Sequence, residues 1–195
     1  MKTITLTRTI ASYDELTPAQ KSKVLDKYRD CNVTDSFWHD CIIDDAKEIG
    51  KLLGFRIQNV YFRGFWSQGD GACIVGGFSY PGKSIIKAIK EYAPVDAELH
   101  RIAKECQSLF AAGFYGVSGS VKQTGRYFSM DVECDAEKGA ADYEAWEEVV
   151  KDFSDWIYKQ LEKEYEYLVG DEAVAESLRA NDMEFEIDED GDLIF

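Results

Sequence analysis

The sequence predicts an α+β fold, a single domain in which an antiparallel sheet built from hairpins has helices packed mainly on one face. Short turn sequences separate pairs of segments rich in aromatic and β-branched residues, a pattern typical of β-hairpins and hence of antiparallel strands. Other segments carry apolar residues at intervals of three and four, which is typical of amphipathic helices. With 195 residues, of which 45% are apolar and 30% charged, the chain has the size and composition of one folded domain over residues 1–195.

The stretch Arg56–Tyr80 is the expected centre of this sheet. Its segments 60–66 and 72–80 flank the sequence SQGDG, and this spacing predicts a hairpin. Gly69 and Gly71 are the turn residues at which φ can be positive.

Three further regions of the chain predict strands. The run Lys2–Ile10 alternates Thr with Ile and Leu. Residues 115–122 and 127–134 flank the turn sequence QTGR and form a second predicted hairpin. The final sequence FEIDEDGDLIF predicts a tight hairpin or paired strand that turns at Asp190 and Gly191.

The helices have recognisable start and stop signals. The sequence TPAQ at 17–20 has the form of a capping box with Pro18 at the first helical position, and Ala19, Val24, Leu25 and Tyr28 form the expected buried stripe. A second helix is expected from Thr34 or Asp35 to Gly54. Further helices are predicted over residues 83–92, 96–111, 143–168 and 171–180.

The net charge of −15 is unevenly distributed. Residues 1–130 contain 17 Lys or Arg and 14 Asp or Glu, whereas residues 131–195 contain 5 and 23. The strongly acidic C-terminal third opposes direct binding to nucleic acid or to an anionic membrane and suits a protein with a basic surface. Acidity that serves solubility alone is the alternative.

The chain shows no signal peptide and no apolar run near the roughly 20 residues of a membrane span, so we expect a cytoplasmic protein without membrane contact. The five cysteines include no CxxC pair, and His39 and His100 are the only histidines. Reduced, mostly buried thiols are therefore expected, with no zinc site and no cofactor.

One segment matches a nucleotide-binding pattern. The sequence GFSYPGKS at 77–84 has the spacing of a phosphate-binding loop, in which Lys83 would pair with phosphate and Ser84 would contact magnesium. The preceding segment, however, is predicted to be the second arm of a hairpin. A turn that caps a short helix is the favoured interpretation, and a nucleotide hydrolase is the alternative.

Clustered carboxylates give weaker hints of metal or acid–base chemistry. DEDGD at 188–192 lacks the 12-residue frame of a calcium loop, so an acidic turn is favoured. Asp70 is a candidate base for a metal-dependent hydrolase, but a turn held by its side chain is favoured. Asp40, Asp44 and Glu48 form a row of like charges one helical turn apart, which mildly destabilises a helix. The row therefore indicates a cationic partner or a metal, unless it is a solvated helix face. No nucleophile is paired with either histidine, so no catalytic residue is assigned.

Three stretches carry a family resemblance: DDAKEIGKLLGFRIQNVYFRGFWSQGDGACIVG, KAIKEYAPVDAELHRIA and FSDWIYKQLEKEYEYLVGDEAVAESLRAND. Together they resemble small acidic proteins of bacteriophages and other mobile elements that often carry the label antitoxin of a toxin-antitoxin stability system. The resemblance covers most of residues 35–185, and YFRGFWSQGDGA is among its most specific parts. It implies a phage or prophage protein that acts inside a bacterial cell.

Charge and resemblance together predict a non-enzymatic inhibitor, an antitoxin or anti-defence protein, that binds a basic host protein through its acidic C-terminal third. A small nucleotide- or metal-dependent hydrolase is the alternative. The expected partner-binding residues are exposed aromatic, polar and acidic side chains: Trp66, Gln68, Asp70, Glu147, Glu148, Asp152, Asp155, Glu162 and Glu166.

Overall fold

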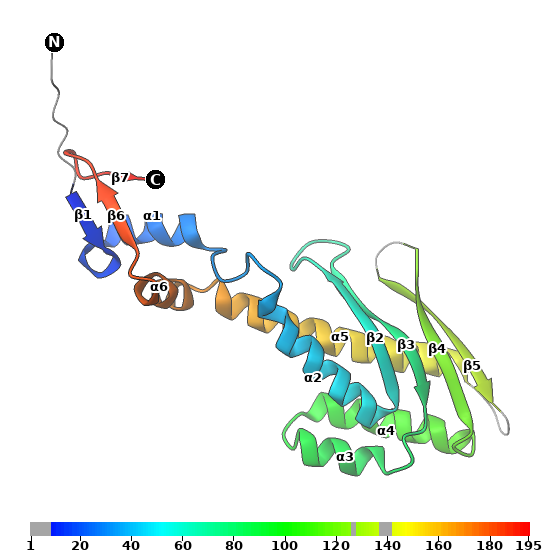
Figure 1. Ribbon diagram of the computed structural model, residues 1–195. Coiled ribbons are helices and arrows are strands. Elements are labelled where there is room, and N and C mark those ends of the chain that lie inside the picture. Colours follow the sequence, from blue (N-terminus) through cyan, green and yellow to red (C-terminus); the bar gives the residue numbers. More distant parts are fainter. Residues whose placement is uncertain (1–8, 126–127, 137–141) are drawn as a thin grey trace. The chain divides into compact units, whose positions relative to one another are not determined.

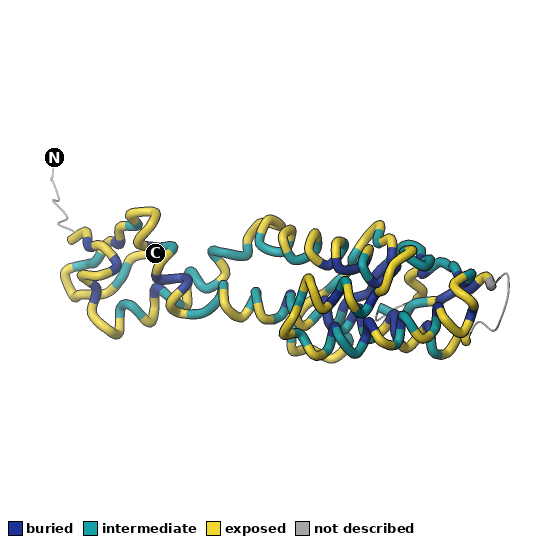
Figure 2. Tube along the Cα trace, turned by 90° about the horizontal axis from the view of Figure 1, so that it is seen from below, coloured by how far each residue is buried: buried dark blue, intermediate teal, exposed yellow. Residues whose placement is uncertain are grey.

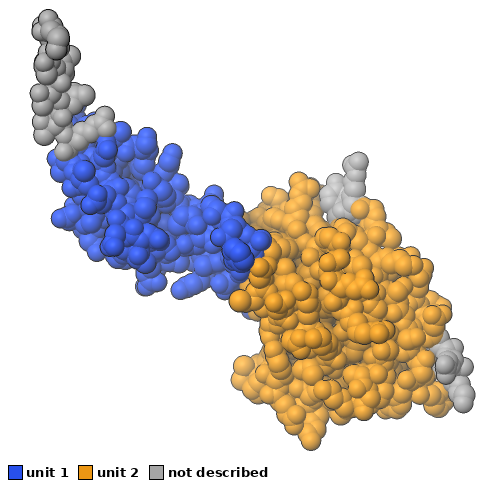
Figure 3. All heavy atoms as spheres, viewed as in Figure 1, with its two compact units in different colours: residues 1–38, 163–195 blue, residues 39–162 orange. Residues whose placement is uncertain are grey.

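The computed structural model describes residues 9–125, 128–136 and 142–195 (Figure 1). Its helices and antiparallel sheets confirm the α+β class. The chain divides into two compact units (Figure 3): unit 1 comprises residues 1–38 and 163–195, and unit 2 comprises residues 39–162. One sheet was expected, whereas each unit has a sheet of its own.

The sheet of unit 2 is built from two hairpins, as predicted. Its strand order is β2 (Phe55–Arg63), β3 (Gly71–Ser79), β4 (Val117–Thr124) and β5 (Ser129–Ala136), and all neighbours are antiparallel. The expectation that the first hairpin forms the centre of the sheet is wrong for β2, because β4 pairs with β3 and leaves β2 at an edge. The predicted start of the last strand at Tyr127 lies outside the described residues.

Helices cover one face of this sheet, as expected (Figure 1). They are α2 (Phe37–Leu53), α3 (Ile85–Tyr92), α4 (Ala97–Ala112) and α5 (Tyr143–Leu168). α5 has the predicted bounds, because its apolar stripe continues without a break over its whole length. α2 begins later than predicted and ends where Gly54 takes the left-handed conformation, with φ +102°.

The core of unit 2 consists of aromatic rings that join the sheet to the helices. Phe55 of β2 stacks on Phe153 of α5 with ring centroids 5.7 Å apart, and Phe78 of β3 stacks on Trp146 at 4.4 Å. Phe110 of α4 meets Trp146 at 4.8 Å in an edge arrangement. Full burial of such rings contributes on the order of 2–3 kcal/mol each, so this cluster contributes strongly to the stability of the unit. Buried segments of the chain are dark blue in Figure 2.

The sheet of unit 1 joins the two ends of the described chain. β1 (Thr9–Ser12) pairs with β6 (Glu184–Ile187), which pairs with β7 (Leu193–Ile194), all antiparallel. A short 3₁₀ helix (Tyr13–Glu15) follows β1. Most of the predicted N-terminal strand lies outside the described residues, and the described strand extends past Ile10 to Ser12.

Two helices, α1 (Pro18–Tyr28) and α6 (Asp171–Ala180), complete unit 1. The capping box of α1 is confirmed: the Thr17 hydroxyl accepts from the Gln20 amide, and the Gln20 side chain accepts from the Thr17 amide at 2.8 Å. Val24 is fully buried as expected. Ala19 is exposed, so its placement in the buried stripe is wrong; it lies in the first turn, ahead of the part of α1 that packs on the core.

Candidate functional site

The turn between β2 and β3 presents Trp66 to solvent. The Trp66 side chain is 64% exposed, and its backbone has a φ of +73°, in the left-handed region that non-glycine residues avoid. The Asp70 carboxylate accepts from the Ser67 amide at 2.7 Å, and the Asp70 amide donates to the Ser67 carbonyl at 3.1 Å. Asp70 therefore holds the turn, as the favoured interpretation of SQGDG predicted. Of its two glycines only Gly69 has positive φ.

Helix α5 fixes the tip of this hairpin through Tyr158. The Tyr158 hydroxyl donates to the Gly64 carbonyl at 3.2 Å, and its ring lies 5.4 Å from that of Phe65. Phe65 in turn contacts Trp66 at 6.1 Å. Tyr158 thus positions the segment that carries Trp66. It was missed in the sequence because it lies at the border of the apolar stripe of α5, where periodicity does not show what it contacts.

Two carboxylates influence this anchoring point. Burial raises the pKa of Tyr158, and the nearby charges of Glu162 and Asp70 raise it further. Asp70 also lines a groove with Glu147 and Asp155, which lie on one row of α5. Five of the predicted residues therefore lie on the hairpin tip of unit 2 or along the part of α5 that contacts it. We call them the Trp66 patch: Trp66, Asp70, Glu147, Asp155 and Glu162.

Lysine compensates one carboxylate of the Trp66 patch. Lys151 lies in the same row of α5, between Glu147 and Asp155, and forms an ion pair with Asp155 at 2.5 Å. Gln68 is at the margin of the patch, where it lines an adjoining groove with Asp70 and Arg63.

The remaining predicted residues lie elsewhere. Asp152 accepts from Arg101 of α4 at 2.8 Å, and the same guanidinium pairs with Glu98 at 2.7 Å and Glu105 at 2.8 Å. Asp152 thus joins α5 to α4, and its side chain is only 23% exposed. Glu148 is exposed on α5, and Glu166 belongs to unit 1.

The acidic C-terminal third is shared between the units. Residues 131–162 belong to unit 2 and residues 163–195 to unit 1. Unit 1 contains 8 Lys or Arg and 17 Asp or Glu, and unit 2 contains 14 and 20. Each unit therefore carries its own excess of carboxylates.

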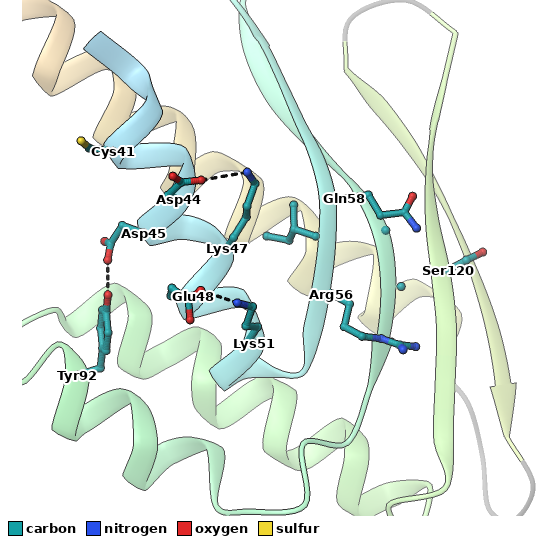
Figure 4. Close-up of a pocket in the computed structure, with 13 residues that line it drawn as sticks. Cys41, Asp44, Asp45, Lys47, Glu48, Lys51, Arg56, Gln58, Tyr92 and Ser120 are labelled. Atoms are coloured by element: carbon teal, nitrogen blue, oxygen red, sulfur yellow. Dashed lines mark hydrogen bonds and ion pairs between the residues drawn. The ribbon is translucent and has the colours of Figure 1, made fainter. Parts of the chain in front are cut away.

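A wide groove of about 1200 Å³ lies along α2 and the sheet of unit 2 (Figure 4). Asp44 and Glu48 of the acidic row of α2 line it, and lysines one turn along compensate their charges: Asp44 accepts from Lys47 at 3.1 Å, and Glu48 pairs with Lys51. The row is thus a solvated helix face with internal ion pairs. Among the described residues, no group of three or more His, Cys, Asp or Glu side chains could hold a metal ion.

The pattern GFSYPGKS has a structural role. Gly77 and Phe78 are paired on both sides within β3, and Ser79 is paired with β4, so this part of the chain cannot wrap around a phosphate. The Ser84 hydroxyl accepts from the Lys87 amide at 3.4 Å and donates to Gln107 at 3.3 Å. This segment is therefore the helix-capping turn that was the favoured interpretation.

The histidines and cysteines are not arranged as catalytic pairs. A ring nitrogen of His100 lies 2.8 Å from the Ala93 carbonyl, and the His39 ring packs on Phe62 at 5.1 Å. All five cysteines are free, and three are buried, as expected for reduced thiols. Burial raises the pKa of Cys134 to about 11, which makes this thiol unreactive near neutral pH.

The DEDGD turn is also explained by internal hydrogen bonds. The Asp188 carboxylate accepts from the Asp190 amide at 3.1 Å and from the Asp192 amide at 2.8 Å. Gly191 has a φ of +88°. This is an acidic turn of the favoured kind, and it joins β6 to β7.

Fold and site define the class: an α+β protein with a fixed hairpin tip that exposes an aromatic side chain among carboxylates. The chain belongs to the family described as a domain of unknown function (DUF8835), whose model matches residues 38–171. This range includes the whole Trp66 patch and the whole sheet of unit 2. Neither the curated proteins nor the solved structures contain a match to the chain. No helix within the described ranges has the length and apolar character that crossing a bilayer requires.

Proposed function

We propose that the protein is a non-enzymatic inhibitor that binds a basic host protein through the Trp66 patch. The observation that carries the proposal is the exposure of Trp66, 64%, on a hairpin tip anchored by Tyr158, whose hydroxyl is influenced by the charges of Glu162 and Asp70. Large aromatic side chains dominate binding energy at the centre of protein interfaces, and surrounding charges select the partner. An aromatic anchor within an acidic rim therefore suits a partner with exposed Lys and Arg.

The turn that carries Trp66 is fixed before any partner binds. Trp66 itself has a φ of +73°, between Gly64 and Gly69 with φ of +55° and +91°. Tyr158 holds the turn from α5 through its hydrogen bond to Gly64. Because the turn that carries Trp66 is already held in place, its backbone loses little conformational freedom when a partner binds.

The carboxylates indicate what the partner presents. Glu147 and Glu162 form no ion pair among the described residues, whereas Asp155 is paired with Lys151. Lys or Arg side chains of a partner would meet these free charges and could also stack on the face of Trp66. Because such pairs are exposed at the rim, salt should weaken the complex, mostly by slowing association.

The setting of this activity is part of the proposal. The motif YFRGFWSQGDGA, which carries much of the resemblance to phage and mobile-element proteins, forms the hairpin tip itself. We therefore place the protein in the cytoplasm of a bacterial host, where its target would be a toxin or a defence factor.

Affinity capture from a bacterial lysate tests the proposal. Wild-type protein is used as bait beside Trp66→Ala/Glu162→Gln and a matched control, Phe114→Ala/Glu144→Gln. Phe114 is also in unit 2, is 73% exposed and has a φ of +52°, so the control removes an equivalent aromatic side chain and one equivalent charge. We expect one basic protein with the wild type and the control, and its loss with the Trp66 variant. Equal capture by all three baits would refute the assignment of the surface.

A further inference from the structure

Unit 1 contains a second surface that is both apolar and acidic, separate from the Trp66 patch. It is a groove of about 620 Å³ formed by the segment before α2, the first residues of α2, the end of α5 and one face of α6. Phe37 and Tyr167 line it and are 76% and 63% exposed. Trp38, Leu168 and Ala173 provide further apolar surface, and we call this the Phe37 groove.

Every charged side chain that lines the Phe37 groove is a carboxylate: Asp35, Glu164 and Glu176. None of the three forms an ion pair with any residue in the described parts of the chain. Lys23, Arg29 and Arg179 of unit 1 are paired with other acids, as Arg29 is with Asp171 at 2.9 Å. The groove thus combines an apolar surface with an uncompensated negative charge.

Hydrogen bonds hold the groove in its shape. The Asn32 amide donates to the Leu168 carbonyl at 3.0 Å, and the Ser177 hydroxyl donates to the Asn32 side chain at 2.6 Å. These contacts attach α6 to the end of α5. Trp38 packs edge-on against Tyr165 at 5.9 Å. The apolar residues are therefore displayed on a preformed surface, which reduces the entropy lost on binding.

We propose that the Phe37 groove binds an amphipathic helix of a partner protein, with apolar side chains facing Phe37 and Tyr167 and with Lys or Arg on its flanks. Grooves between helices receive such segments through anchors spaced at three and four residues. Charge complementarity selects a basic segment, because all charged residues that line the groove are acidic. The proposal does not depend on the Trp66 patch, which is built from other residues.

The test uses two fluorescently labelled peptides of identical composition, 12 residues each and made of Leu, Ala, Lys and Arg. In one, Leu recurs at helical spacing on a single face; in the other, the order is scrambled. Fluorescence anisotropy with the full chain at physiological salt measures binding. Because the two peptides carry equal charge, a preference of about tenfold for the amphipathic peptide reports the apolar groove. Equal affinities would overturn the proposal.

Variants then locate the binding. Phe37→Ala/Tyr167→Ala is expected to weaken the amphipathic peptide about tenfold, and Glu164→Gln/Glu176→Gln about threefold to tenfold. Glu184→Gln/Glu189→Gln removes the same number of exposed charges from unit 1 and should change affinity less than twofold. Trp66→Ala should leave peptide binding at the Phe37 groove intact. The result at this groove is therefore independent of whether the Trp66 patch binds a partner.

Circular dichroism of each variant verifies the fold, and sedimentation tests the competing occupant. Wild-type affinity in a folded Phe37→Ala/Tyr167→Ala variant would refute the proposal. A wild-type dimer that this variant converts to a monomer would also refute it, because a second copy of the chain would then fill the groove.

Discussion

The left-handed backbone at Trp66 predicts an inverted order of stability for two substitutions. In most positions glycine destabilises relative to alanine, because it loses more conformational entropy on folding, about 0.4–1 kcal/mol. At a φ of +73° alanine retains a backbone cost of about 1–2 kcal/mol that glycine lacks. We therefore expect Trp66→Gly to be about 0.5–1 kcal/mol more stable than Trp66→Ala.

Urea unfolding, followed by the fluorescence of the remaining tryptophans, measures this difference. Both variants lack Trp66, so Trp146 and Trp156 of unit 2 give the same signal in each. Tyr61 is the matched control, because it is 44% exposed within strand β2 and has no positive φ. There Tyr61→Gly should be less stable than Tyr61→Ala. If Trp66→Gly is as unstable as Trp66→Ala, or less stable, the argument from backbone strain is wrong.

Three further outcomes follow from the contacts of unit 2. Arg101→Met should lower the free energy of unfolding by about 1–3 kcal/mol in chemical denaturation, because Asp152, only 23% exposed, loses its ion pair; an unchanged midpoint would contradict this. Hydrogen bonding to Arg101 lowers the pKa of Glu98 from 4.5, so its contribution is present above about pH 4.5 and lost as the pH falls through the lowered pKa. Melting temperatures from pH 7 to 3 should fall less steeply for Glu98→Gln than for wild type. Gly119→Ala would place a methyl group 2.2 Å from the Glu133 carbonyl oxygen and should cost more than about 2 kcal/mol; wild-type stability would show that β4 is wrongly placed.

A ligand measurement addresses the hydrolase alternative. Ser84 is engaged in capping α3, and Asp44 and Glu48 of α2 are paired with lysines, so these groups are not free for a nucleotide or metal. We expect thermal melting to be unchanged by ATP with magnesium, by calcium or by manganese. A rise of several degrees with any of them would favour a ligand-binding function.

Local signals in the sequence predicted helix ends and turns well, because these features depend on residues close together in the chain. The capping box at Thr17, the positive φ of Gly54 and the full length of α5 depend on neighbours within one or two helical turns. The turn function of Asp70 was also predictable, because its carboxylate binds an amide three residues away. Periodicity and turn chemistry contain this information.

Long-range pairing could not be predicted in the same way. The pairing of β1 with β6 joins residues at opposite ends of the chain, and neither segment contains a sequence signal that identifies its partner strand. The role of Asp152 depends on Arg101, which lies on a separate helix, so a carboxylate that appeared to face solvent is part of the helix packing. The Phe37 groove was missed because Phe37 reads as part of the apolar stripe of α2. Contacts between side chains far apart in the sequence form only in the tertiary structure, so the spacing of apolar and polar residues along the chain does not reveal them.

Hydrogen exchange of the complex with a captured partner tests the central claim most directly. Amides of residues 64–71 and 151–162 should exchange more slowly in the complex, and the effect should vanish for Trp66→Ala/Glu162→Gln. Protection that leaves both segments unchanged, or that persists in this variant, would mean that Trp66 and its neighbouring carboxylates are not where the partner binds.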